Sequence, residues 1–336
     1  MSTVCLTMIV RDEASIIKRC LLSALPYIDG YFIIDTGSKD DTINIIEDTL
    51  GHLPGVVLEE EWVNFAHNRT SLVRQAREAG FDYLLLGDAD MTFEGELGDL
   101  TADGYLIRMS GDFEYHMPYL VSSRLNWWYR GVTHEFLGAN EPFLQVKHPT
   151  FVINHLADGG RRTDGLKWSN DRELLEAEYA KGPDTELHDR TTFYLAQTCR
   201  DLGDNERAEA LYRERADTGG WVEEAYWAMF MVGELSGDIN DYLRAWNFRP
   251  SRPEAVQRMI KLENERRNYW SAYAIGSTYL KNIRRTEDVL FVLLPLARSR
   301  RQGKESSPRR DTDEESANTA ARGPLPRCRV RERSRY

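Results

Sequence analysis

Cysteine is scarce in this chain of 336 residues, and its four cysteines lack the spacing of a disulfide framework or a metal site. We therefore expect free thiols in a reducing compartment. No apolar run approaches the ~20 residues that a membrane-spanning helix needs. The N-terminus also lacks the basic stretch that opens a secretion signal. These absences predict a soluble cytoplasmic protein without a membrane span.

Basic charge is also sparse outside the C-terminal end. The net charge is -11, but residues 298–336 carry a net of +6, so the remainder carries -17. Such an acidic body disfavours binding to the phosphate backbone of nucleic acids, and we do not expect nucleic acid as a partner. Residues 298–336 hold almost no large apolar side chains, which predicts a disordered basic tail. Their Arg-rich, patternless composition is also typical of translation in a shifted reading frame.

Short apolar runs alternate with helical patterns over the first 160 residues. The predicted strands are 4–10, 31–34, 56–58 and 83–86. The predicted helices are 16–25, 41–50 and 66–79. This alternation predicts a parallel sheet with right-handed crossovers. Ligands bind such sheets beyond the carboxyl ends of the strands, so the residues that follow each strand are the candidates for function.

From about residue 165 the pattern is wholly helical. Residues 190–219 place small and large apolar side chains at offsets typical of a tetratricopeptide repeat, whose period is about 34 residues. Two pairs keep this spacing: Leu211 with Ala245, and Tyr212 with Trp246. A third, partial copy covers residues 253–280. We expect two to three stacked hairpins, whose concave surface suits a peptide or protein; a homodimer through this region is the alternative.

The stretch LLLGDADMTF holds two carboxylates, Asp88 and Asp90, just after a buried strand. Side chains two residues apart in extended chain project to the same side. Two carboxylates so placed hold a hard divalent cation, and that cation neutralises a diphosphate. A D-x-D pair also occurs in ordinary solvated loops, but its place at a strand end favours a metal site.

The stretch IIDTGSKDDT follows another buried strand. Gly37 permits a tight turn there, and Ser38 or Asp41 is placed to cap the next helix. In a binding role, Asp35 would accept hydrogen bonds from a nucleotide base or ribose. The capping role and the binding role are compatible, because one turn can serve both.

The sequence from Cys5 to Thr42, followed by LGDAD, resembles a family 2 glycosyltransferase of the GT-A fold. The resemblance covers roughly residues 4–285. Residues 154–221 also resemble members with appended tetratricopeptide-like helices, among them enzymes that glycosylate bacteriocin peptides on cysteine. The resemblance implies an α/β fold, a Rossmann-like mixed sheet with a nucleotide-sugar site, followed by an all-α domain of helical-hairpin repeats. The implied domains are 1–160 and 161–297, with the tail at 298–336.

The implied activity is transfer of a sugar from a UDP- or GDP-linked donor with inversion, using Mn²⁺ or Mg²⁺. The acceptor stays open between a peptide or protein and a glycan. One alternative is a nucleotidyltransferase, but the loop VRDEAS after the first strand has no glycine and one arginine. The other alternative is a non-catalytic adaptor that binds a partner through its helical repeats.

Position by position, the resemblance assigns the nucleotide-sugar site mainly to the first loop and to residues near the strand ends. These residues are Val10, Arg11, Glu13, Asp35, Arg69 and Asp88. Asp88 is expected nearer the ribose and Asp90 on the metal. Arg69, on a helix, is expected to approach the donor phosphates; the alternative is an ordinary surface arginine.

The stretch NWWYRGVTHEFL supplies the expected catalytic group. Inversion needs a general base that takes a proton from the acceptor. Glu135 resembles the family's catalytic carboxylate, and His134 precedes it. An exposed strand pair is the alternative. Trp128, assigned to the nucleotide-sugar site, is expected to offer an apolar platform to a sugar or to the acceptor, or else to pack in the core.

The stretch FVINHLADGGRRTDGLKW ends the first domain. The resemblance implies that His155 completes the metal shell, and its imidazole suits Mn²⁺ better than Mg²⁺. A lone histidine at a strand end is otherwise structural. Arg161 and Lys167 lie on a glycine-containing loop that is expected to close over the diphosphate, or to serve as a flexible linker.

Overall fold

The structure is a computed structural model that describes residues 2–110, 115–159 and 167–282. The predicted tail at 298–336 and the predicted site residue Arg161 lie outside the described residues. Two compact units divide the chain, one ending at Met259 and the other beginning at Ile260. The domain boundaries predicted from the sequence stay a prediction.

Strands and helices alternate through the first part of the chain, as predicted. They are β1 (Val4–Val10), α1 (Ile17–Ala24), η1 (Leu25–Tyr27), β2 (Gly30–Asp35), α2 (Thr42–Leu50), β3 (Gly55–Glu59), α3 (Phe65–Glu78) and β4 (Tyr83–Gly87). Each predicted element is confirmed to within one residue at either end. Pro26 lies in the 3-10 turn that follows α1, and Gly80 follows α3 with a φ of +88°. Proline lacks the backbone N–H that a helix interior needs, and glycine readily adopts the positive φ that follows a helix, so both are typical of helix ends.

The remaining strands make the sheet mixed. They are β5 (Met91–Glu94), β6 (Gly104–Ser110), β7 (Tyr115–Ser122), β8 (Trp127–Arg130), β9 (Phe136–Ala139) and β10 (Gln145–His155). The main sheet has the order β3-β2-β1-β4-β7-β6-β10-β5, and β8 pairs with β9 in a separate hairpin. Strands β3, β2, β1 and β4 are parallel, whereas β7 is antiparallel to β4. This mixed, Rossmann-like sheet is the GT-A-like architecture that the sequence predicts.

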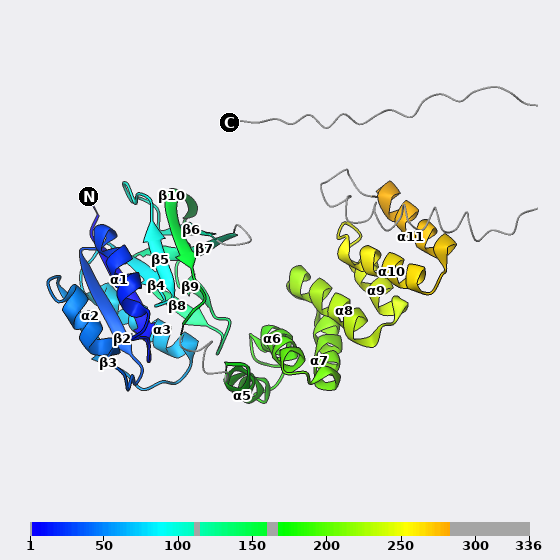
Figure 1. The fold of residues 1–336 in the computed structure, drawn as a ribbon, viewed down its shortest axis with the longest axis horizontal. Helices are drawn as coiled ribbons and strands as arrows, with labels where there is room; N and C mark the ends of the chain where they lie inside the picture. The colour runs from blue at the N-terminus through cyan, green and yellow to red at the C-terminus, as the bar shows by residue number, and fades with distance from the viewer. Residues whose placement is uncertain (1, 111–114, 160–166, 283–336) are drawn as a thin grey trace, which may run out of the picture. The chain divides into compact units, whose positions relative to one another are not determined.

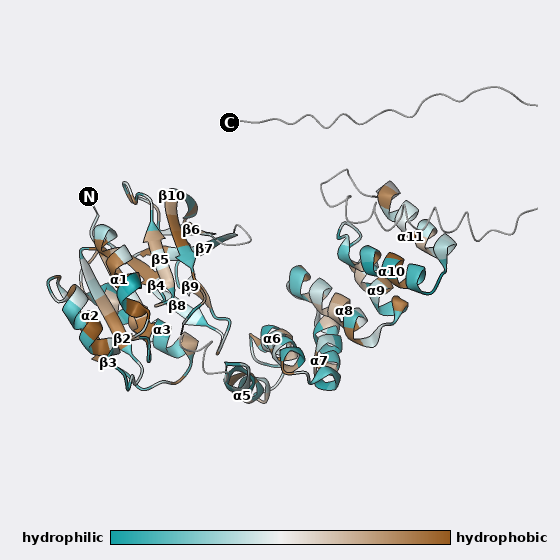
Figure 2. Ribbon diagram, viewed as in Figure 1, coloured by the Kyte–Doolittle hydropathy of each residue, from teal (hydrophilic) through white to brown (hydrophobic). Residues whose placement is uncertain are grey.

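Helices cover both faces of the sheet (Figure 1). Leu6 of β1 packs in one apolar cluster with residues of α1 and α2. Its neighbour Cys5 packs in a second cluster with α3 and the β8–β9 hairpin. Adjacent residues of a strand face opposite sides, so an uninterrupted apolar strand is buried on both. The central strands are accordingly brown in Figure 2.

From residue 167 to residue 282, the described elements are helices joined by turns. The first unit contains α5 (Lys167–Tyr179), α6 (His188–Asp201), α7 (Asn205–Thr218), α8 (Val222–Ser236) and α9 (Ile239–Phe248), and consecutive helices contact one another. Helix α10 (Glu254–Glu265) crosses into the second unit, which also contains α11 (Tyr269–Asn282). None of the described helices is both long and apolar enough to cross a membrane.

The predicted 34-residue period is visible in the first unit. Leu211 on α7 and Ala245 on α9 are both buried. Gly203 and Gly237, which share the same spacing, precede these two helices with positive φ angles of +82° and +69°. Glycine takes this conformation without steric cost, so the same tight turn opens the second helix of each hairpin. The α6–α7 and α8–α9 pairs are therefore the predicted helical hairpins.

Candidate active site

The carboxyl ends of β2, β1 and β4 lie side by side at one edge of the sheet. Val10 pairs with Asp35 between β1 and β2, and Met8 pairs with Gly87 between β1 and β4. The loops that follow these three strands therefore meet, and Asp88 directly follows Gly87. Parallel topology brings together the segments that the sequence singled out.

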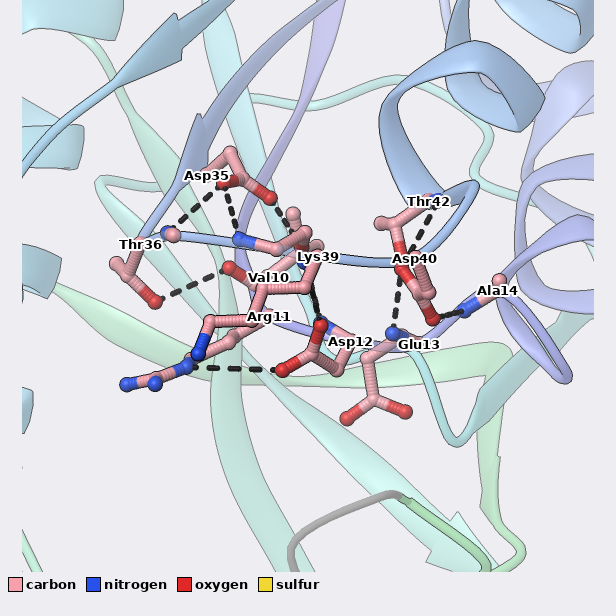
Figure 3. A network of polar contacts seen from close by, with 12 residues as sticks. Val10, Arg11, Asp12, Glu13, Ala14, Asp35, Thr36, Lys39, Asp40 and Thr42 are labelled. Atoms are coloured by element: carbon pink, nitrogen blue, oxygen red, sulfur yellow. Dashed lines mark hydrogen bonds and ion pairs between the residues drawn. The ribbon is translucent and has the colours of Figure 1, made fainter.

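Asp35 holds the turn that follows β2 (Figure 3). Its Oδ1 accepts hydrogen bonds from the backbone N–H groups of Gly37 and Ser38, both at 2.8 Å. Its Oδ2 accepts the hydroxyl of Ser38. The residue is only 1% exposed. Gly37 has a φ of +104°, so the predicted tight turn is present, and the contact of Asp35 with a base or ribose stays a prediction.

The side-chain hydrogen bond at the start of helix α2 comes from Asp40, the neighbour of the predicted capping residue Asp41. Asp40 Oδ1 accepts the backbone N–H of Thr42 at 3.0 Å, and Asp40 Oδ2 accepts that of Ala14 at 3.0 Å. Burial works to raise the pKa of Asp40, but these hydrogen bonds outweigh it and lower the pKa. Asp41 makes no side-chain cap bond, and the Ser38 hydroxyl binds Asp35 instead. Asp41 occupies the N-cap position, one of the two predicted, but Asp40 supplies the side-chain hydrogen bond at this end of the helix.

The loop that follows β1 is hydrogen-bonded to the turn that follows β2. The N–H of Lys39 donates to Asp12 Oδ1 at 2.7 Å, and the N–H of Glu13 donates to Thr42 Oγ1 at 2.8 Å. Asp12 has a φ of +54°, which aspartate tolerates better than most residues. Arg11 Nε lies 3.8 Å from Asp12 Oδ2 (Figure 3). These bonds fix the backbone from Val10 to Glu13, the loop predicted to contact the nucleotide.

Asp88 and Asp90 follow the same strand but contact different partners. Asp88 Oδ1 accepts a hydrogen bond from Arg69 Nη2 at 2.5 Å. Asp90 Oδ2 lies 3.1 Å from His155 Nε2. Strand β10 delivers that histidine, and the N–H of Leu156 donates to the carbonyl of Asp90 at 2.9 Å. The structure thus places His155 beside the carboxylate pair, as predicted.

Asp90 and His155 are two of the three residues predicted to hold a metal ion, and their side chains lie together. They offer one carboxylate oxygen and one imidazole nitrogen, a combination that suits Mn²⁺. Their side chains are 14% and 31% exposed, so the site is open to solvent. In the described part of the chain, no group of three or more His, Cys, Asp or Glu side chains is arranged to hold a metal. The full set of Asp88, Asp90 and His155 as ligands stays a prediction.

The segment that follows β10 is held against α1 beside this pair. Arg19 donates to both carboxylate oxygens of Asp158, at 2.9 and 2.8 Å. The hydrogen bond from Arg19 lowers the pKa of Asp158. The following Gly159 lies beside the Asp90 carboxylate, since a Cβ atom at this position would be 3.4 Å from Asp90 Oδ2, in ordinary van der Waals contact. Arg19 and Asp158 lie 139 residues apart and are not among the site residues predicted from the sequence.

Arg69 dominates the electrostatics of the site. Its Nε lies 2.8 Å from Glu135 Oε1, an ion pair whose angle is not that of a hydrogen bond. Only 11% of the side chain is exposed. Burial works to lower the pKa of Arg69, but attraction to Asp88 and Glu135 raises it well above the ordinary value. Arg69 is therefore a fixed cation between two carboxylates, and the surface-arginine alternative is wrong. Its contact with donor phosphates stays a prediction.

Glu135 and His134 lie in the turn between β8 and β9 and face different partners. The Glu135 side chain, 16% exposed, contacts Arg69. His134 is exposed, has a φ of +52°, and stacks its ring on Tyr194 of α6. The two ring centroids are 4.1 Å apart, with planes 7° from parallel. Of the two predicted catalytic residues, Glu135 therefore joins the cluster around Asp88. The catalytic roles of both stay predictions.

Trp128 and Lys167 pack against their own neighbours. The ring of Trp128 covers Gly138 across the β8–β9 hairpin, where a Cβ atom would approach to 2.3 Å. The guanidinium carbon of Arg130 lies 4.2 Å from the centre of the same ring. Lys167 begins α5, and its Nζ lies 4.4 Å from the ring centre of Trp168. The donor-binding roles of Trp128 and Lys167 stay predictions.

Comparison with known proteins gives partial likenesses. No family model matches the chain. A TPR repeat-containing protein of Synechococcus elongatus is 36% identical over 91 residues, which are 27% of this chain and 21% of that protein. The chain therefore spans about a fifth of the length of the curated relative that it matches.

Among solved structures, the chain is similar to S. aureus TarS 1-349 in complex with UDP. The TM-score is 0.36 at 11% identity, covering 79% of this chain and 91% of that one. Another TarS structure gives a TM-score of 0.37 at 13% identity, covering 90% of this chain and 55% of that one. Neither likeness decides the family to which the chain belongs.

Proposed function

We propose that this protein is a family 2-like glycosyltransferase that moves a sugar, with inversion, from a UDP- or GDP-activated donor. The observation that carries the proposal is the meeting of chemically active residues from separate segments at one sheet edge. Asp88 and Asp90 follow β4, His155 ends β10, and Arg69 on α3 joins Asp88 to Glu135. Placing several carboxylates close together costs electrostatic free energy. Packing of the fold does not require this arrangement, so the cluster indicates a function.

On the donor side, Asp90 and His155 would hold a divalent ion, Mn²⁺ or Mg²⁺. When bound, such an ion offsets the negative charge of the departing nucleoside diphosphate. The backbone from Val10 to Glu13 and the Asp35 turn would contact the nucleotide, because both lie at the carboxyl edge of the sheet. The hydrogen bond from Arg69 would fix the orientation of the Asp88 carboxylate.

On the acceptor side, Glu135 would take the proton from the attacking group. Its ion pair with Arg69 fixes the orientation of the carboxylate, and its partial exposure leaves it accessible. A positioned general base contributes roughly 10²–10⁴-fold in rate. We propose a peptide, protein or glycan as acceptor, with the helical region as a surface for it or for a second copy of the chain.

Donor binding is the first test. Thermal unfolding is measured with a panel of UDP- and GDP-sugars, with and without Mn²⁺. A ligand at about 100 times its Kd stabilises the native state by about 2.7 kcal/mol. Asp90→Asn should remove the metal-dependent part of that shift. Asp99→Asn is the matched control, because Asp99 is exposed. If no nucleotide sugar stabilises the parent with metal present, the proposal fails and the adaptor alternative gains support.

Transfer is the second test. Glu135→Gln keeps the shape of the side chain but removes its basicity, so kcat should fall by roughly 10²–10⁴-fold. Donor affinity should stay near that of the parent. Glu94→Gln, at an exposed position of β5, controls for the loss of a carboxylate. A Glu135→Gln protein with parental turnover would place the base elsewhere.

A further inference from the structure

The turn that carries Glu135 has an unfavourable backbone. It joins β8 to β9, and both Gly131 and His134 have positive φ angles, +104° and +52°. Glycine accepts this conformation freely, whereas histidine does so at a cost. Such a conformation persists only where the surroundings impose it. The residue directly before Glu135 is therefore held in place by contacts from outside the turn.

Helix α6 supplies those contacts. The ring of Tyr194 stacks on the imidazole of His134, with centroids 4.1 Å apart. Arg190 Nη2 donates a hydrogen bond to the carbonyl oxygen of His134 at 2.9 Å. Arg190 and Tyr194 are four residues apart, so they lie on the same face of the helix. One face of α6 thus contacts both the side chain and the backbone of His134.

Arg190 is itself held in place by an ion pair inside the helical region. Arg190 Nη1 pairs with Glu224 Oε1 of α8 at 3.1 Å. The other carboxylate oxygen of Glu224 lies 3.3 Å from Arg215 Nη2 of α7. Glu224 is 5% exposed and Arg215 is 1% exposed. Buried and paired side chains have little freedom to move, so the position of Arg190 is set by three helices together.

We propose that Tyr194 and Arg190 are positioning residues of the active site, which hold the turn at 131–135 so that Glu135 meets Arg69. This inference rests on the proposed function for its kinetic consequence. Its structural part, that α6 sets the conformation of the turn, stands apart from any reaction. The helical region then completes the catalytic domain as well as offering a surface to partners.

The test compares Tyr194→Ala with Tyr194→Phe in the full chain. Hydrogen exchange of residues 131–136, followed by mass spectrometry, should accelerate about tenfold or more in Tyr194→Ala, because the turn loses its stacking partner. Tyr194→Phe keeps the ring and should match the parent. Phe248→Ala, which removes an aromatic ring that is 40% exposed on α9, is the matched control. Unchanged exchange of the turn in Tyr194→Ala would overturn the proposal.

Kinetics provide the second readout. Tyr194→Ala should lower kcat by about 10–100-fold, since a displacement of the order of 1 Å in a catalytic group costs that much. The Kd for the donor should stay within about twofold, because the donor side is untouched. Equal loss of kcat and donor affinity would indicate general disruption and refute a positioning role.

A variant on the turn itself guards against misfolding of the helices. His134→Gly removes the stacked ring and tolerates the positive φ, so the chain should fold while exchange of the turn accelerates. Slow, parental exchange in this variant would also contradict the proposal. If the parent transfers no sugar at all, the proposed function fails, while the exchange experiment still decides whether α6 holds the turn.

Discussion

Arg69→Met replaces the buried cation between Asp88 and Glu135 with an apolar side chain of similar length. Removing one partner of a buried ion pair costs about 3–5 kcal/mol. The Asp88 side chain is 29% exposed and that of Glu135 16%, so water partly relieves the stranded charges. We therefore expect the lower end, about 3 kcal/mol. At 2–4 °C per kcal/mol for a unit of this size, Tm should fall by roughly 6–12 °C.

The pH dependence separates this electrostatic cause from lost packing. The pKa of Arg69 is raised, so its contribution is fully present below the pKa of an unfolded arginine and is lost only as the pH rises above it. The parent should keep this contribution throughout the neutral range. In Arg69→Met the cost comes from two uncompensated carboxylates, which protonation removes. The gap in Tm between variant and parent should therefore be smaller in acid than at neutral pH.

The assay is thermal unfolding by circular dichroism at several pH values. Arg74→Met is the matched control, because Arg74 lies on the same helix and is exposed. Its effect should stay within about 0.5 kcal/mol. An Arg69→Met protein as stable as the parent at pH 7, or a deficit that does not change with pH, would refute the reasoning.

Three further outcomes follow from packing and burial. Gly138→Ala should lower the free energy of unfolding, measured by chemical denaturation, by about 1–3 kcal/mol, because the new Cβ would lie 2.3 Å from the Trp128 ring. Gly104→Ala is the control and should lower it less, because the nearest atom to its Cβ would be 3.5 Å away. Burial raises the pKa of the Cys20 thiol to about 12, so peptide mapping after treatment with a thiol reagent at pH 8 should find it unmodified in the folded protein. Arg215→Met, at a position 1% exposed, should lower the free energy of unfolding by about 3–5 kcal/mol; a smaller loss would show that water reaches the pair.

The elements that the sequence predicts well are those that local pattern determines. The strand from Val4 to Val10 is an apolar run bounded by polar residues, and its limits in the structure are the predicted ones. Because parallel strands end at one edge, placing the strands also places Asp35 and Asp88. His155 was associated with the metal site by the family resemblance, since the apolar run before it indicates that a strand ends there but not which other strand ends lie nearby.

The contacts that the sequence does not predict are long-range and between ordinary surface residue types. Arg19 and Asp158 form a pair across 139 residues, and neither was assigned a role in the stretch that contains it. The choice of Asp40 over Asp41 at the start of α2 depends on where Ala14 lies. From the sequence, Tyr194 cannot be distinguished from the other aromatic residues of the helical repeats. The structure shows that it stacks on His134. In each case tertiary packing decides between candidates that local chemistry leaves equal.

The position of β10 has a consequence for synthesis of the protein. In the sheet, β10 lies between β6 and β5, so β5 pairs with a strand that begins roughly 50 residues later in the chain. At ~5–20 residues per second, a ribosome needs about 3–10 s to make that stretch. During this interval β5 has no strand to pair with and stays an exposed edge, whereas the strands with which β1 to β4 pair have already been made. We therefore expect this half of the sheet, and with it the meeting of His155 and Asp90, to form late and to be where a nascent chain depends on chaperones.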